Sequence, residues 1–160
     1  LPVAHQPREH HPMKKEPVRV YTHRFVFPPE SEDENQHVNN IEYVRLLQES
    51  AIAHTRQNGW TPEELHSRDW TWVVRSHFIE YLQPCRAGEP IAVQTWVANF
   101  QKIRSLRKYR FVRESDGTLL ATAQTSWVFL NLRTGRPVAI PPEVLAAYQA
   151  VPAAEEPGES

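Results

Sequence analysis

The stretch that decides the fold spans residues 33–59 and reads DENQHVNNIEYVRLLQESAIAHTRQNG. Its first eight residues are densely polar, and from Asn39 onward apolar residues recur every three to four positions, as they do in an α-helix. Asn58 and Gly59 supply a C-terminal stop signal. The stretch therefore predicts a polar loop that turns into a long helix at about residue 39.

The polar loop has two interpretations on local grounds. Asp and Asn are common capping residues, so the loop can simply be a well-capped helix start. The other interpretation is a catalytic site, because a helix N-terminus presents unpaired backbone N–H groups and the positive end of the helix dipole. Such a site suits a carbonyl oxygen that becomes negative, and the Asp33 carboxylate beside it could activate water or attack directly.

The remaining chain predicts an antiparallel α+β domain. Apolar and small residues reach far around the long helix, which suggests that it is covered on more than one side. Alternating or β-branched and aromatic stretches predict strands, and Asp116-Gly117 predicts a hairpin turn between the last two. The expected strands span residues 18–27, 71–82, 91–97, 105–113 and 119–131, and short helices are expected near residues 61–64 and 141–149.

Length and composition limit the number of domains and the classes of protein to which this chain can belong. The 160 residues suffice for one domain, expected at residues 18–150, with a flexible extension at residues 1–17 and a disordered acidic tail at residues 151–160. A net charge of −1 gives no global reason to expect nucleic acid, and no apolar run reaches the length of a membrane span. The single cysteine, Cys85, fits a reducing compartment, so a cytoplasmic protein is expected.

One motif resembles the signature of hotdog-fold acyl thioesterases of the 4-hydroxybenzoyl-CoA thioesterase-like families. It consists of Asp33, Asn35, His37 and residues 38–40, followed by Tyr43. Its spacing is more similar still to that of the acyl-ACP thioesterases. The resemblance covers about residues 21–142. It implies a hotdog fold, in which a five-stranded antiparallel sheet wraps around one long central helix.

The resemblance also implies roles for individual residues. Asp33 would be the catalytic carboxylate, Asn35 and His37 would orient it, the water or the leaving group, and backbone amides near Asn40 would polarise the thioester carbonyl. Tyr43 would contribute to substrate binding.

Two departures and one rival carboxylate accompany this assignment. Gln36 stands where the broad family has Gly, as it does in the acyl-ACP group, and only Cys85 matches that group's Glu-Cys pair. Cys85 lacks an activating context and is expected to be structural. Glu49 is the rival carboxylate, because one hotdog branch uses a helix glutamate, whereas His54 is expected to be a core histidine.

Residues 102–110 hold the densest positive cluster in the chain. It is either a solvated hairpin or a surface that captures the anionic carrier, CoA phosphates or an acidic carrier protein. Strand alternation places Lys108 and Arg110 on one face and Arg107 on the other. Arg104, Arg107 and Arg136 are the candidate carrier-binding residues.

The expected function is hydrolysis of an acyl-CoA or acyl-ACP thioester to a carboxylic acid and a thiol. No metal or organic cofactor is expected, since the thioester is already activated and water is the second substrate. The resemblance implies a homodimer, or a homotetramer built from two such dimers, with active sites at the subunit interface. The alternatives are a hotdog dehydratase or hydratase, and a non-catalytic acyl-thioester binding protein.

Overall fold

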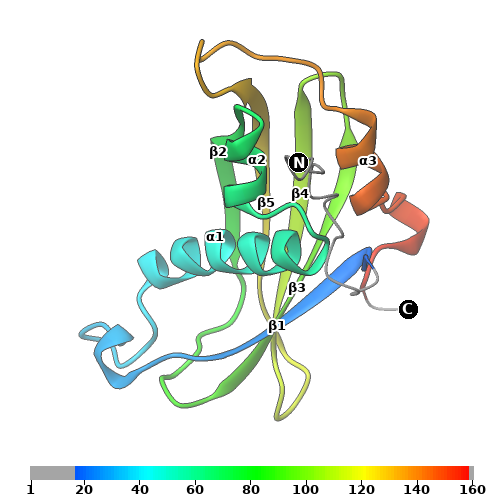
Figure 1. Cartoon of the computed structure of the whole chain (residues 1–160). Coiled ribbons are helices and arrows are strands. Elements are labelled where there is room, and N and C mark those ends of the chain that lie inside the picture. Colours follow the sequence, from blue (N-terminus) through cyan, green and yellow to red (C-terminus); the bar gives the residue numbers. More distant parts are fainter. Residues whose placement is uncertain (1–16, 159–160) are drawn as a thin grey trace, which may run out of the picture.

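The computed structural model describes residues 17–158. Along the chain the elements are ordered β1, α1, α2, β2, β3, β4, β5 and α3, with single 3-10 turns after β1 and after α3 (Figure 1). Their bounds are β1 Val20–Val26, α1 Asn40–Gln57, α2 Pro62–Ser67, β2 Trp70–Tyr81, β3 Pro90–Phe100, β4 Arg104–Arg113, β5 Leu119–Asn131, α3 Pro142–Tyr148, and the turns Pro29–Ser31 and Ala153–Glu155. Within this part of the chain, no helix is both long and apolar enough to cross a membrane.

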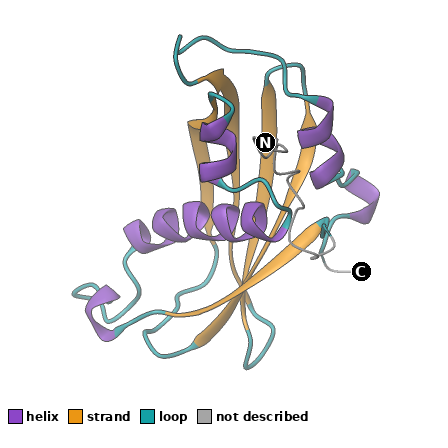
Figure 2. Ribbon diagram, in the orientation of Figure 1, coloured by secondary structure: helices purple, strands orange, loops and turns teal. Residues whose placement is uncertain are grey.

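The five strands form one antiparallel sheet in the order β1-β3-β4-β5-β2. Strands β1 and β2 therefore lie at opposite edges, although β2 is the next strand after β1 in the sequence. The connection between them must cross the full sheet, about 19 Å for four strand spacings. Helix α1, with 18 residues and thus about 27 Å long, lies across one face of the sheet (Figure 2). Its first residue, Asn40, contacts Tyr81 at the end of β2, and His54 near its end contacts Val18 just before β1, so the chain returns to the β2 edge through the segment after α1 and through α2.

One side of α1 packs against the sheet through side chains that recur at helical spacing: Tyr43, Leu46, Leu47, Ser50, Ala51 and His54 are buried. Buried strand residues such as Val93, Tyr109 and Phe111 cover this side, and the Tyr109 hydroxyl donates to the Leu47 carbonyl at 3.0 Å. This architecture confirms the predicted α+β hotdog fold.

The opposite side of α1 differs from the prediction that the helix is covered on more than one side. Ile41 is 66% exposed in the single chain, and Val44 and Ile52 are also exposed. The sequence pattern detected apolar residues there correctly, but no element within residues 17–158 covers them.

The chain end also differs from the prediction. Residues 151–158 pack against the domain instead of forming a disordered tail: Val151 is buried, and its N–H donates to the Val97 carbonyl at 2.8 Å. Glu156 pairs with Lys108 at 2.9 Å. Most of the flexible segment predicted at residues 1–17, and residues 159–160, lie outside the described part of the chain.

Candidate active site

The polar loop before α1 is closed by its own backbone. The Asp33 N–H donates to the His37 carbonyl at 2.8 Å, and the Gln36 N–H donates to the Asp33 carbonyl at 3.0 Å. Gln36 takes a left-handed conformation, with a φ of 61°. That conformation is one that glycine adopts without steric cost, which explains why glycine suits this position in the related signature.

Contacts with the β2–β3 connection fix the loop on the sheet. The Val38 N–H donates to the Cys85 carbonyl at 2.8 Å, and the Ala87 N–H donates to the Glu32 carboxylate at 2.9 Å. The Asn39 N–H donates to the Ser31 carbonyl at 2.8 Å. These bonds hold both ends of the loop and so set the position of Asp33.

The Asp33 carboxylate is half-buried and held through one oxygen. Its Oδ1 accepts from the N–H of Asn35 at 2.8 Å and, more weakly, from the N–H of His37 at 3.3 Å. Oδ2 has no hydrogen-bond partner among residues 17–158. One oxygen therefore orients the group, and the other is available to a water molecule or a carbonyl carbon.

The side chains of Asn35 and His37 are exposed, and neither bonds to the Asp33 carboxylate in the described structure. The loop does bring them close to Asp33 in the chain. Their backbone N–H groups bond to the carboxylate, and both residues were expected to orient Asp33, the water or the leaving group.

The N-terminus of α1 lies directly after this loop. Asn39 is its N-cap and accepts from the Ile41 N–H at 3.0 Å. The N–H of Asn40 has no acceptor among the described residues, which leaves one donor free at the positive end of the helix. The Tyr81 hydroxyl, from the end of β2, donates to the Asn40 carbonyl at 3.0 Å and fixes this turn.

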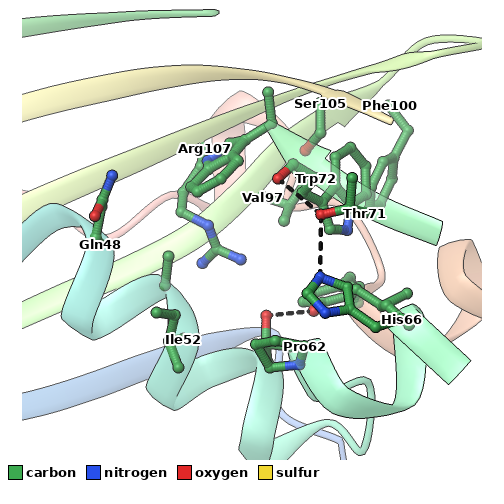
Figure 3. Close-up of a pocket in the computed structure, with 15 residues that line it drawn as sticks. Gln48, Ile52, Pro62, His66, Thr71, Trp72, Val97, Phe100, Ser105 and Arg107 are labelled. Atoms are coloured by element: carbon green, nitrogen blue, oxygen red, sulfur yellow. Dashed lines mark hydrogen bonds between the residues drawn. The ribbon is translucent and has the colours of Figure 1, made fainter. Parts of the chain in front are cut away.

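A pocket with a volume of about 260 Å³ lies between α1, α2 and the sheet (Figure 3). Most of its lining is apolar, and Arg107 reaches into it from β4. It touches α1 from Gln48 to Thr55, and Gln48 follows Asn40 by eight residues and thus by about 12 Å of helix.

Comparison with known proteins decides the family. The family model described as the thioesterase-like superfamily matches residues 27–148. The chain belongs to this superfamily.

Individual relatives agree with the family. Over 104 residues, the chain is 31% identical to a chloroplastic palmitoyl-acyl carrier protein thioesterase of Cuphea hookeriana, a match that covers 61% of this chain and 25% of that protein. It is 24% identical over 133 residues to the acyl-CoA thioester hydrolase YbgC of Escherichia coli, covering 83% of this chain and 93% of YbgC. The chain thus spans about a quarter of the length of its plant relatives.

Solved structures show the same fold. The acyl-ACP thioesterase of Bacteroides thetaiotaomicron superimposes with a TM-score of 0.76 at 25% identity, over 88% of this chain and 58% of that one. The thioesterase-like chain described here thus corresponds to part of that longer protein.

Tyr43, from the signature, and Glu49, the rival carboxylate, lie away from Asp33. Tyr43 is only 3% exposed and packs against Phe27, Tyr81 and Phe111, so it is a core residue and does not present a surface to substrate in this structure. Glu49 is exposed on the outer side of α1, about 14 Å of helix beyond Asn40. Within one chain, the two candidate carboxylates do not form a pair.

The three candidate arginines separate in the structure. Arg104, at the start of β4, and Arg136, after β5, are exposed, whereas Arg107 is only 5% exposed and faces α1. Lys108 and Arg110 lie on the other face of β4, as the alternation predicted, and bond to Glu156 and Gln94. Arg107 therefore lines a buried pocket and does not share an exposed surface with Arg104 and Arg136.

His54 is a core histidine, as expected. Its Nε2 lies 2.6 Å from the Val18 carbonyl, which can only accept, so Nε2 carries the proton and Nδ1 accepts from Arg107 Nη1 at 2.9 Å. Burial, reinforced by the Arg107 cation, lowers the pKa of His54 to about 3. The ring is therefore neutral at physiological pH.

Cys85 is a structural thiol, as expected. It is buried in the main core cluster, and burial raises the pKa of its thiol to about 12. A nucleophilic cysteine needs the thiolate form, which this environment disfavours.

Proposed function

We propose that this chain hydrolyses an acyl thioester, acyl-CoA or acyl-ACP, with Asp33 as the catalytic carboxylate. The observation that carries the proposal is the geometry of Asp33: Oδ1 is held by two loop amides, while Oδ2 is unpartnered among the described residues. This group stands before a helix whose first N–H, that of Asn40, also has no acceptor within residues 17–158.

The proposed chemistry needs only these groups and water. The Asn40 N–H polarises the thioester carbonyl and stabilises the oxyanion that forms on attack. As a general base, Oδ2 of Asp33 takes a proton from water while the water oxygen bonds to the carbonyl carbon. The C–S bond then breaks, and the proton passes to the leaving thiolate. As a nucleophile, Oδ2 attacks the carbonyl carbon itself, and the C–S bond breaks to give an acyl anhydride and a thiolate, which takes a proton from water. A water molecule then hydrolyses the anhydride, which releases the carboxylic acid and restores the Asp33 carboxylate.

The superfamily and the printed names of the relatives support the substrate class. YbgC is named for acyl-CoA and the plant proteins for acyl carrier protein, so both carriers belong to the proposal. The exposed Arg104 and Arg136 remain proposed contacts for the anionic carrier. A homodimer, or a tetramer made of two dimers, is proposed as the active form.

The test is thiol release from a panel of acyl-CoA and acyl-ACP substrates. Asp33→Asn is expected to lower kcat at least about 100-fold, the usual size of a lost general base. The variant should fold, because the asparagine oxygen can accept from the same two loop amides. Glu34→Gln, the exposed carboxylate next to Asp33, is the matched control and should keep wild-type activity.

The rival assignments give different outcomes. Full activity in Asp33→Asn together with loss in Glu49→Gln would move the chemistry to the helix glutamate. Water addition to an enoyl-CoA, without thiol release, would identify a hydratase. Binding of acyl-CoA by a folded wild-type protein that hydrolyses no substrate would identify a non-catalytic binder.

A further inference from the structure

Arg107 is a buried cation that has no counter-ion among residues 17–158. Its Nη1 donates to His54 Nδ1 at 2.9 Å and to the Thr95 hydroxyl at 3.1 Å, which uses two of the five guanidinium N–H groups. Along residues 17–158, the N–H groups on Nε and Nη2 have no hydrogen-bond partner, and no carboxylate lies within 4.0 Å of the guanidinium.

The surroundings do not neutralise this charge. His54 is uncharged, for the reasons given above, and none of the described residues that line the pocket is acidic. The Tyr148 ring lies 5.9 Å from the guanidinium carbon and offers only a weak cation–π contact. A buried charge that lacks a partner is costly, so the fold keeps Arg107 here at the expense of stability.

The free part of the guanidinium faces the pocket. Figure 3 shows it in the open space between Ile52 and Pro62, away from the strand that carries it. Ser105, two residues earlier on the same face of β4, is buried, also lines the pocket and has no hydrogen-bond partner among the residues described. As far as the described residues show, the pocket thus holds one unneutralised cation and one hydroxyl without a hydrogen-bond partner.

The other lining side chains are suited to a hydrocarbon chain. Most of the remaining wall is apolar or aromatic, and the exposed residues Gln48, Ile52 and His66 form the mouth. The hydroxyls of Thr55 and Thr71, which also line the pocket, bond to Tyr148 and His66. The apolar wall residues are Ala51, Leu65, Trp72, Val97, Phe100 and Trp127. The pocket volume of about 260 Å³ lies just below the range of about 300–1,000 Å³ for pockets that bind drug-sized ligands. A pocket of this size suits an acyl chain of short or medium length.

We propose that this pocket binds an acyl chain whose far end carries a carboxylate, and that Arg107 recognises that carboxylate. The proposal rests on the proposed thioesterase function and narrows its substrate class to dicarboxylic acyl thioesters. Two N–H groups of a guanidinium match the two oxygens of a carboxylate, which lysine cannot reproduce. The thioester end then remains outside the mouth, where the catalytic groups of the assembled enzyme act on it.

The test compares two substrates of equal acyl-chain length. Octanoyl-CoA ends in a methyl group, and suberoyl-CoA ends in a carboxylate. Wild type is expected to show the higher kcat/KM for suberoyl-CoA. Arg107→Met should lower the ratio of suberoyl to octanoyl kcat/KM at least about tenfold, the size expected for a lost charged hydrogen bond. Arg110→Met, on the opposite face of the same strand, is the matched control and should keep the wild-type ratio.

A second variant avoids disturbing the buried network. Gln48→Glu changes one exposed atom at the mouth into a negative charge, so it should fold normally and lower the same ratio through repulsion. Equal kcat/KM values for the two substrates in wild type, or an unchanged ratio in both variants, would overturn the proposal.

Binding is measured separately through the fluorescence of Trp72 and Trp127, which line the pocket. Tighter binding of suberoyl-CoA than of octanoyl-CoA, lost in Arg107→Met, would support the pocket assignment even if wild type hydrolysed neither thioester. The absence of hydrolysis of both thioesters would then refute only the proposed hydrolysis. Tight binding of free octanoate, without any preference for suberoyl-CoA, would overturn the proposal, because the pocket would then hold a free acid.

Discussion

At the scale of single residues, a few backbone bonds place the catalytic candidate. Asp33 is oriented by the N–H groups of Asn35 and His37, and the loop that supplies them turns back through Gln36 at a φ of 61°. A left-handed conformation costs a residue with a side chain about 1–2 kcal/mol. The loop therefore stores a small strain next to the carboxylate that it orients.

Gln36→Gly should release this strain. Glycine loses more chain entropy on folding, which offsets part of the gain, so the expected change is from zero to about 1 kcal/mol of added stability. Gln36→Val should instead cost about 1–2 kcal/mol, because a β-branched side chain is strongly disfavoured at positive φ. Urea denaturation of the three proteins measures the order, and a glycine variant less stable than wild type would contradict this account.

At the scale of elements, sequence patterns located the strands and helices well because each carries a clear signal. The 3.6-residue period from Asn39, the Thr61-Pro62 start of α2 and the Asp116-Gly117 turn all appear in the structure where they were predicted. These signals are local. The strand order could be expected only through the family resemblance, since pairing of β1 with β3 and of β2 with β5 is a long-range choice.

The expectations that differ from the structure, those about Arg107 and about the chain end, have a common cause. Strand alternation showed which face Arg107 occupies, but it did not show that α1 and α2 bury that face. The tail looked disordered because Val151 is its one large apolar residue among Pro, Ala and Glu, yet a prepared site beside Val97 buries it. Tertiary neighbours decide such cases, and one sequence does not display them.

Strand β2 is the element most suited to hold a second copy of the chain. It lies at a sheet edge, has 12 residues against 7 in the other edge strand β1, and carries Phe78, which is 56% exposed. A long edge strand with exposed apolar side chains is a ready site for pairing. The uncovered apolar side of α1 is a second surface that such a partner could cover.

Lysine at this edge should therefore separate the subunits. Wild type is expected to sediment as the proposed dimer, and Phe78→Lys combined with Val73→Lys is expected to sediment as a monomer and to lose thiol release if the site needs both subunits. Val26→Lys, a change of the same kind on the exposed part of β1, should leave the dimer intact. Monomers from the β1 variant alone would place the interface at the opposite edge.

At the scale of the whole molecule, His54 joins four parts of the fold. From α1 it bonds to Val18, which precedes β1, and to Arg107 on β4, and its ring packs against Tyr21 of β1 and Tyr148 of α3. Because these contacts require a neutral ring next to a cation, protonation of His54 opposes the entire native arrangement. The pH dependence of global unfolding should report this coupling.

The sign follows from the two pKa values of His54. In the folded chain the pKa is about 3, and in the unfolded chain it is near 6.5, so between these values the unfolded chain binds more protons. The contribution is fully present above pH 6.5 and is lost as the pH falls towards 3. Between pH 7 and pH 5, where most carboxylates remain ionised, this histidine alone should lower the free energy of unfolding by about 2 kcal/mol.

Urea denaturation at pH 7 and pH 5 measures this loss, and His54→Gln isolates it. Glutamine offers an acceptor for Arg107 and a donor for the Val18 carbonyl but does not titrate, so the variant should lose about 2 kcal/mol less than wild type between the two pH values. His37→Gln replaces an exposed histidine and should keep the wild-type difference. If His54→Gln showed the same pH dependence as wild type, the buried ring would not be the group that links protons to the stability of this fold.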